Sequence, residues 1–140
     1  MVILSNFISA KIVFTCFGRG VLINENLMHR VKMAARLAIR PQTKSFRDNV
    51  KDECQKCGVK EYGLGLEVDH VINFRDIFNS FIKNYEEKIL LESVYKEHSG
   101  DLWYFSDKKI KEEWCEYHKE NAKLQLLCKP CHKNKTYNKE

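Results

Sequence analysis

The chain has 140 residues, 44% of them hydrophobic and 31% charged, and this composition excludes both a disordered tail and a membrane protein. The length fits one domain, or one small domain with an extension. The formal net charge of +5 is mildly basic, so it permits a polyanionic partner without requiring one.

The most apolar segment, residues 3–14, predicts one or two strands, with a helix as the alternative. No segment approaches the roughly 20 apolar residues that span a bilayer. The apolar segment has no basic region before it, Lys11 interrupts it, and no cleavage site of small residues follows. We therefore expect no signal peptide and no membrane association, and a protein that is not secreted and stays in the reducing cytoplasm.

A basic helix is predicted next, within residues 24–41. Asn24 or Asn26 can cap its start, alanines favour its middle, and Pro41 ends it. One side of this helix is apolar and the opposite side is basic, and the basic side carries Lys32, Arg36 and Arg40. The basic side of a helix is either solvated or in contact with the phosphates of a nucleic acid. The second interpretation requires that a nucleic-acid site exists elsewhere in the chain.

Four of the six cysteines form two C-x-x-C pairs about 70 residues apart. They are Cys54, Cys57, Cys128 and Cys131. Each pair has the form of a zinc knuckle, and four thiolates suit a closed tetrahedral zinc of structural role; the alternative is two redox-active or buried pairs. Gly58 permits the tight turn after the first pair. Cys16 and Cys115 have no partner motif and are predicted to be core thiols.

An acid and a histidine stand side by side in a strand predicted over residues 64–72. Alternation places Asp69 and His70 on opposite faces of this strand, so both contribute only to a site at its end. His132 directly follows the second cysteine pair. A zinc that joins the two pairs would bring His132 close to Asp69 and His70, which predicts an oxygen–imidazole site beside the thiolate site.

The segment between the two cysteine pairs predicts three helices. Two sets of apolar residues have helical spacing and are predicted to be core: Ile77, Phe78, Phe81 and Ile82, then Ile89, Leu90, Val94 and Tyr95. A third helix is predicted over residues 107–120, with Ile110, Trp114 and Tyr117 on one face. A short strand follows over residues 124–127, and a short basic helix carrying Lys133 and Lys135 follows the second cysteine pair.

Together these motifs resemble the HNH endonucleases of the zinc-knuckle type. The resemblance covers about residues 54–136 and rests on Cys-x-x-Cys, Val-Asp-His-Val and Leu-Gln-Leu-Leu-Cys-x-x-Cys-His-x-x-Lys-Thr. It implies an α+β fold with a ββα-metal, treble-clef-like core and a structural zinc held by the four paired cysteines. It also implies that Asp69 and His132 bind one catalytic divalent cation and that His70 is the general base. One carboxylate with one imidazole leaves most cation positions open, which suits Mg²⁺, Mn²⁺ or Ni²⁺.

The chain departs from the family pattern in two places. Lys123 stands where family members usually carry Asn before Leu-Gln, so we assign to Asn121 the role of bracing the loop that holds the base. The second departure is a helical insertion at about residues 73–120, between the two strands of the motif. Some phage and mobile-element HNH proteins look similar there. We divide the chain into an extension over residues 1–50 and a nuclease domain over residues 51–140.

The leading hypothesis is a metal-dependent endonuclease that hydrolyses DNA, by nicking or by double-strand cleavage, in the cytoplasm of a bacterial or phage-infected cell. The predicted DNA contacts are Lys32, Arg36, Arg40, Lys133 and Lys135. One alternative is a non-catalytic zinc-knuckle module that binds nucleic acid, and another is a purely structural zinc protein. The sequence leaves open whether the protein forms a homodimer or is a component of a larger assembly.

Overall fold

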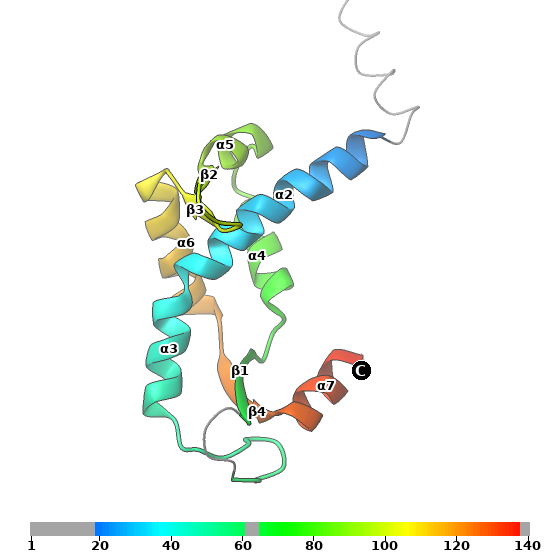
Figure 1. Cartoon of the computed structure of the whole chain (residues 1–140), viewed down its shortest axis with the longest axis vertical. Coiled ribbons are helices and arrows are strands. Elements are labelled where there is room, and N and C mark those ends of the chain that lie inside the picture. Colours follow the sequence, from blue (N-terminus) through cyan, green and yellow to red (C-terminus); the bar gives the residue numbers. More distant parts are fainter. Residues whose placement is uncertain (1–18, 61–64, 138–140) are drawn as a thin grey trace, which may run out of the picture.

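The computed structural model describes residues 19–60 and 65–137, of which residues 19–27 are described by their backbone alone. The fold is of the α+β class, as predicted (Figure 1). The elements are α2 (Arg19–Ala38), α3 (Arg40–Asn49), β1 (Leu66–His70), α4 (Phe74–Ile82), α5 (Glu87–Glu92), β2 (Val94–Lys96), β3 (Trp103–Phe105), α6 (Lys108–Asn121), β4 (Leu124–Cys128) and α7 (Lys129–Tyr137). Among the described helices, none combines the length and the apolar character that a bilayer crossing requires. The strands predicted over 3–14 and the predicted core thiol Cys16 lie outside the described residues.

The predicted basic helix is in fact two helices. α2 begins at Arg19, upstream of Asn24 and Asn26, so neither asparagine caps it. It ends at Ala38, and α3 starts at Arg40 with Pro41 in its first turn. The prediction that Pro41 ends a helix is wrong, because proline is well accommodated in a first turn, where its missing N–H leaves no hydrogen bond unmade. The chain changes direction at this junction (Figure 1).

The larger hydrophobic core lies where α2, α4 and α6 meet around Trp114. The Trp114 side chain is fully buried, and its Nε1 donates a hydrogen bond of 2.9 Å to the carbonyl oxygen of Ala35 in α2. The buried members of this core are Val31, Ala35, Ile39, Phe74, Ile77, Phe78, Phe81, Leu90, Ile110 and Trp114. Residues 31–39 and the insertion therefore share one core.

The insertion between β1 and β4 contains the three predicted helices and an unpredicted hairpin. The predicted helix at 107–120 is confirmed as α6, and the Asp107 side chain caps it by accepting a 3.1 Å hydrogen bond from the amide of Ile110. Placing Val94 and Tyr95 on a helix is wrong, because α5 ends at Glu92 and β2 pairs with β3 in antiparallel fashion. Tyr95 is 49% exposed and stacks on Tyr104 across the hairpin. β-branched and aromatic residues favour such a strand.

The predicted core position of Ile89 is also wrong. Its side chain is 46% exposed, whereas its neighbour Leu90 is 2% exposed and belongs to the larger core. α5 is only six residues long, so it presents one short face to the core and leaves the adjoining position in solvent.

β1 and β4 form an antiparallel pair, and α7 follows β4 without a break and packs against both strands. The register places Asp69 opposite Gln125 and His70 opposite Leu124. A second, smaller core lies at the other end of this pair, and its buried members are Cys54, Leu66, Leu126, Leu127 and Cys128. Both predicted strands of the motif are confirmed, and with α7 they form a β-β-α unit.

Candidate functional site

The four paired cysteines converge on one point. Their sulfur atoms all lie within 4.8 Å of one another, and Sγ of Cys57 is 3.7 Å from Sγ of Cys128. Thiolates bound to one tetrahedral zinc at about 2.3 Å are separated by about 3.8 Å. The predicted convergence of the two pairs is confirmed, and the cluster is compatible with a zinc ion.

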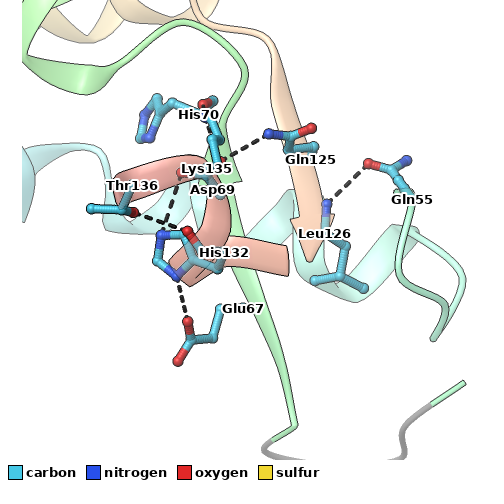
Figure 2. A network of polar contacts seen from close by, with 9 residues as sticks. All are labelled: Gln55, Glu67, Asp69, His70, Gln125, Leu126, His132, Lys135 and Thr136. Carbon is cyan, nitrogen blue, oxygen red and sulfur yellow. Dashed lines mark hydrogen bonds and ion pairs between the residues drawn. The ribbon is translucent and has the colours of Figure 1, made fainter. Parts of the chain in front are cut away.

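The turn that carries the first pair is tied to β4 by two hydrogen bonds. The Gln55 backbone amide donates to the carbonyl oxygen of Leu126 at 2.9 Å. Oε1 of Gln55 accepts from the Leu126 amide, also at 2.9 Å (Figure 2). Gly58 has a φ of 75°, a conformation that favours glycine, and its amide donates to the Cys54 carbonyl oxygen. Burial opposes ionisation of Cys54, but nearby backbone N–H groups outweigh it and lower its pKa to about 6, whereas the contact with Cys128 and burial raise the pKa of Cys131 to about 12. A thiolate is the form that binds zinc.

The second cluster lies where β1 meets α7, and Asp69 and His132 face one another in it (Figure 2). Nε2 of His132 is 3.6 Å from Oδ1 of Asp69. On the other side of the ring, Nδ1 is 2.6 Å from Oε2 of Glu67. A carboxylate accepts the Nδ1 proton, so Nε2 is the ring nitrogen that faces Asp69.

Lys135 and Gln125 occupy the other oxygen of Asp69. Nζ of Lys135 lies 2.5 Å from Oδ2 and also contacts the carbonyl oxygen of His70, and Nε2 of Gln125 donates to the same Oδ2 at 2.8 Å. Partial burial alone would raise the pKa of Asp69, but these hydrogen bonds and the charge of Lys135 outweigh it and hold that pKa below its usual range. Asp69 is therefore an anion whose Oδ1 is directed at His132.

His70 points away from Asp69, as strand alternation predicts, and its ring packs against Phe74 and His118. Nε2 of His70 is 2.9 Å from Nε2 of His118. Burial lowers the pKa of His70, the Asp69 carboxylate opposes this shift, and the charges of Lys135 and Arg36 add to it. The net shift favours the neutral imidazole at neutral pH.

His118 is 1% exposed and was missed in the sequence, and so was its partner Gln42. Nδ1 of His118 lies 2.6 Å from Oε1 of Gln42, and Nε2 of Gln42 donates to the carbonyl oxygen of Cys115 at 2.7 Å. One signal was available: His118 follows Trp114 by four positions and Ile110 by eight, which places an imidazole on the apolar stripe of α6. Nothing in the sequence pairs it with Gln42.

One cavity of about 520 Å³ joins the two sides of β1. Its lining includes Asp69 and His132 from one side and His70 from the other. Basic side chains at its wall are Arg36, Arg75 and Lys135. The arrangement combines a carboxylate and an imidazole nitrogen for a cation, a neutral imidazole for a proton, and positive charge for an anion such as phosphate.

The five predicted DNA contacts lie in different environments in the structure. Arg36 lies over the Phe74 ring, with its guanidinium carbon 4.9 Å from the ring centroid. Arg40 lines a neighbouring surface depression with Lys44 and Arg47 of α3, and this depression shares Thr43 and Val68 with the main cavity. Two other predicted contacts line neither hollow: Lys133 is exposed and Lys32 is half-buried. Lys135, by contrast, is engaged inside the site.

Asn121 lies at the end of α6 with its side chain exposed, and its Nδ2 donates to the carbonyl oxygen of Tyr117 at 2.8 Å. Among the described residues, the hydrogen-bonding neighbour of the His70 ring is His118 rather than Asn121. The backbone of Lys123 braces the end of β1, because its carbonyl oxygen accepts from the Val71 amide. The bracing role of Asn121 stays a prediction.

In comparisons with known proteins, no family model matches the chain, and no curated protein or solved structure matches it either.

Proposed function

We propose that the protein is a metal-dependent endonuclease of the HNH type, with a ββα-metal core, that hydrolyses phosphodiester bonds in DNA. The observation that carries the proposal is the 3.6 Å approach of His132 Nε2 to Asp69 Oδ1, at the wall of the cavity that also exposes His70. A hard oxygen and an imidazole nitrogen would offer two ligands to a divalent cation and leave its other positions open.

The hydrogen bonds around Asp69 and His132 support this assignment. His132 donates its Nδ1 proton in a hydrogen bond to Glu67. When the ring is neutral, the lone pair on His132 Nε2 therefore faces a lone pair on Asp69 Oδ1. Two lone pairs repel unless a positive charge lies between them. Two ligands bound at right angles to a cation at about 2.1 Å are about 3 Å apart, so a small closure of the gap accommodates Mg²⁺ or Mn²⁺.

Phosphodiester hydrolysis forms a bond from a water oxygen to phosphorus and breaks the bond from phosphorus to a sugar oxygen. We assign to neutral His70 the removal of the water proton, and its lowered pKa keeps it unprotonated for that task. Asp69 and His132 would hold a divalent cation, which would supply positive charge at the phosphate and the leaving oxygen. Arg36 and Arg75 bind the phosphate from the cavity wall, and the leaving oxygen takes its proton from solvent.

The thiolate cluster supports a structural zinc in this proposal. The four cysteines come from the turn at residues 54–57 and from the junction of β4 with α7. A closed set of four sulfur ligands leaves no position for a substrate. The zinc would therefore fix the start of α7, and through it His132, against β1.

One observation favours the alternative of a non-catalytic nucleic-acid-binding module. The Lys135 ammonium lies 2.5 Å from Oδ2 of Asp69 and already neutralises the carboxylate. A domain of this kind would retain the zinc and the basic surfaces of α2 and α3 but would not bind a second cation.

A plasmid assay separates the two functions. Zinc-loaded protein is incubated with supercoiled plasmid and Mg²⁺, Mn²⁺ or Ni²⁺, beside His70→Ala, Asp69→Asn and the matched control His98→Ala. His98 is an exposed histidine outside the cavity. We expect nicked or linear plasmid with wild type and His98→Ala, and a loss of at least about 100-fold with the two site variants.

Wild type that cleaves under none of the three metals rules out the enzyme. Retention of DNA that weakens with salt, without cleavage and unchanged by His70→Ala, supports the binding module instead.

A further inference from the structure

A series of three hydrogen bonds connects the His70 ring to a backbone carbonyl in α6. The donor–acceptor distances are 2.9 Å from His70 Nε2 to His118 Nε2, 2.6 Å from His118 Nδ1 to Gln42 Oε1, and 2.7 Å from Gln42 Nε2 to the Cys115 oxygen. The side chains come from β1, α6 and α3.

The chemistry of the groups fixes the direction of every hydrogen bond in the series. A carbonyl oxygen only accepts, so the Gln42 amide nitrogen faces Cys115 and its Oε1 faces His118. An amide oxygen only accepts, so Nδ1 of His118 carries a proton. The Nε2 of a neutral His118 then has only a lone pair to offer, and Nε2 of His70 must donate to it. Neutral His70 is left with its lone pair on Nδ1.

Burial keeps His118 neutral, which this direction requires. The side chain is 1% exposed and packs against the Trp114 ring, which is fully buried. Desolvation, with a smaller contribution from His70, lowers the pKa of His118 to about 4. A protonated His118 would have no acceptor for His70, so the series holds throughout the neutral range.

We propose that His118 and Gln42 are positioning residues that select the Nε2–H tautomer of His70 and present its Nδ1 lone pair to the cavity. The tautomer selection stands on the hydrogen bonds alone, whereas its catalytic consequence rests on the proposed nuclease function. Neither His118 nor Gln42 lines the main cavity, and both line a separate depression together with Leu124. Their effect reaches the reaction only through the orientation and tautomer of His70.

The first test reads the tautomers without any activity. Long-range ¹H–¹⁵N correlation spectra of the zinc-loaded full chain near pH 7.5 distinguish protonated from unprotonated ring nitrogens, with His70→Ala and His118→Phe assigning the signals. We expect His118 to carry its proton on Nδ1 and His70 on Nε2. His118 protonated on Nε2, or His70 on Nδ1, overturns the proposal.

The second test asks whether the series matters for cleavage. His118→Phe keeps a ring of similar volume beside Trp114 but offers no acceptor. Gln42→Leu removes the acceptor of the His118 proton, and Gln42→Glu restores one. We expect kcat to fall on the order of 10²-fold in His118→Phe and Gln42→Leu with KM unchanged, and to recover at least in part in Gln42→Glu.

Ile110→Ala is the control for effects of lost stability on kcat. Ile110 is buried on the same helix, α6, and takes no part in the three hydrogen bonds. The substitution should lower the melting temperature while leaving the kcat of the folded fraction unchanged. Wild-type kcat in folded His118→Phe overturns the catalytic part of the proposal. Wild type without any cleavage instead removes the proposed nuclease function, and the spectra still decide the tautomers.

Discussion

The ammonium group of Lys135 lies 2.5 Å from Oδ2 of Asp69, on the carboxylate whose other oxygen faces His132. A divalent cation at Oδ1, as proposed, would therefore be repelled by the positive charge on the other oxygen of the same carboxylate. Lys135→Met should raise the affinity for Mn²⁺ on the order of tenfold, measured by calorimetric titration of zinc-loaded protein. The control is Lys133→Met, which removes an exposed lysine from the same helix. Unchanged affinity in Lys135→Met would contradict a cation site at Asp69.

The contact between Glu67 and His132 gives a second prediction. Glu67 accepts the Nδ1 proton of His132 at 2.6 Å and so holds the ring with Nε2 towards Asp69. Removing such a carboxylate from a metal-binding histidine costs about 10–100-fold in metal affinity. Glu67→Ala should weaken Mn²⁺ binding by this factor, and Glu67→Gln by less, because an amide oxygen still accepts. Equal affinities in wild type and Glu67→Ala would contradict the assignment of His132 as a ligand.

Zinc removal should affect the two hydrophobic cores unequally. The smaller core contains Cys54 and Cys128, whereas the larger core around Trp114 contains no zinc ligand. Chelation should therefore expose the amides of β1, β4 and α7 to hydrogen exchange. The indole N–H of Trp114, which donates a hydrogen bond to the carbonyl oxygen of Ala35, should stay protected. Simultaneous loss of protection in both regions would show that the cores fold as one unit. One tightly held zinc per chain is the stoichiometry we expect.

Buried His118 predicts a pH dependence of stability. Its pKa falls from an ordinary value of 6.5 to about 4 in the folded protein, so between these values the unfolded chain binds the extra proton and the folded chain does not. This contribution is therefore fully present above pH 6.5 and is lost as the pH falls towards 4. Its size is up to about 3 kcal/mol. Urea unfolding at several pH values should give a smaller acid loss of stability in His118→Phe than in wild type or in His98→Phe.

The basic side chains beside the cavity should contribute to DNA binding through phosphates. Arg36→Ala and Arg40→Ala should each weaken binding to all sequences alike and reduce the slope of log K against log salt by about 1. Lys88→Ala on α5 is the control, since Lys88 is exposed and lies outside both the cavity and the α3 depression. Unchanged slopes for both arginines would mean that these faces of α2 and α3 are only solvated.

The parts of the site that were predictable are those held by local spacing. The two C-x-x-C pairs predicted their convergence, and the position of His132 directly after Cys131 predicted its approach to Asp69, because one short helix start carries both residues. The environment of His70 was not predictable in the same way. His118 and Gln42 are 48 and 28 positions from it in the sequence, and only the tertiary arrangement of β1, α3 and α6 brings the three side chains together.

The helix boundaries show the same division between local and long-range information. Asp107 and the apolar spacing of Ile110 and Trp114 sufficed to predict α6. Pro41 did not reveal on which side of it the helix lay, because proline both stops a helix and begins one. The hairpin of β2 and β3 was missed because its apolar residues continue the spacing of α5, and only cross-strand pairing distinguishes the two structures.

The residues around the cavity have two separate origins along the chain. The ligands proposed for the divalent cation belong to β1 and α7, whereas both hydrogen-bonding partners in the series behind His70 come from α3 and α6. A graft of the β-β-α unit onto another scaffold would therefore include both proposed cation ligands. The ring of His70 would lose its hydrogen-bonding partners in the graft, so it could rotate and adopt either tautomer. The proposed cation ligands could thus be transferred with the unit, whereas the hydrogen bonds that hold His70 depend on α3 and α6 of this chain.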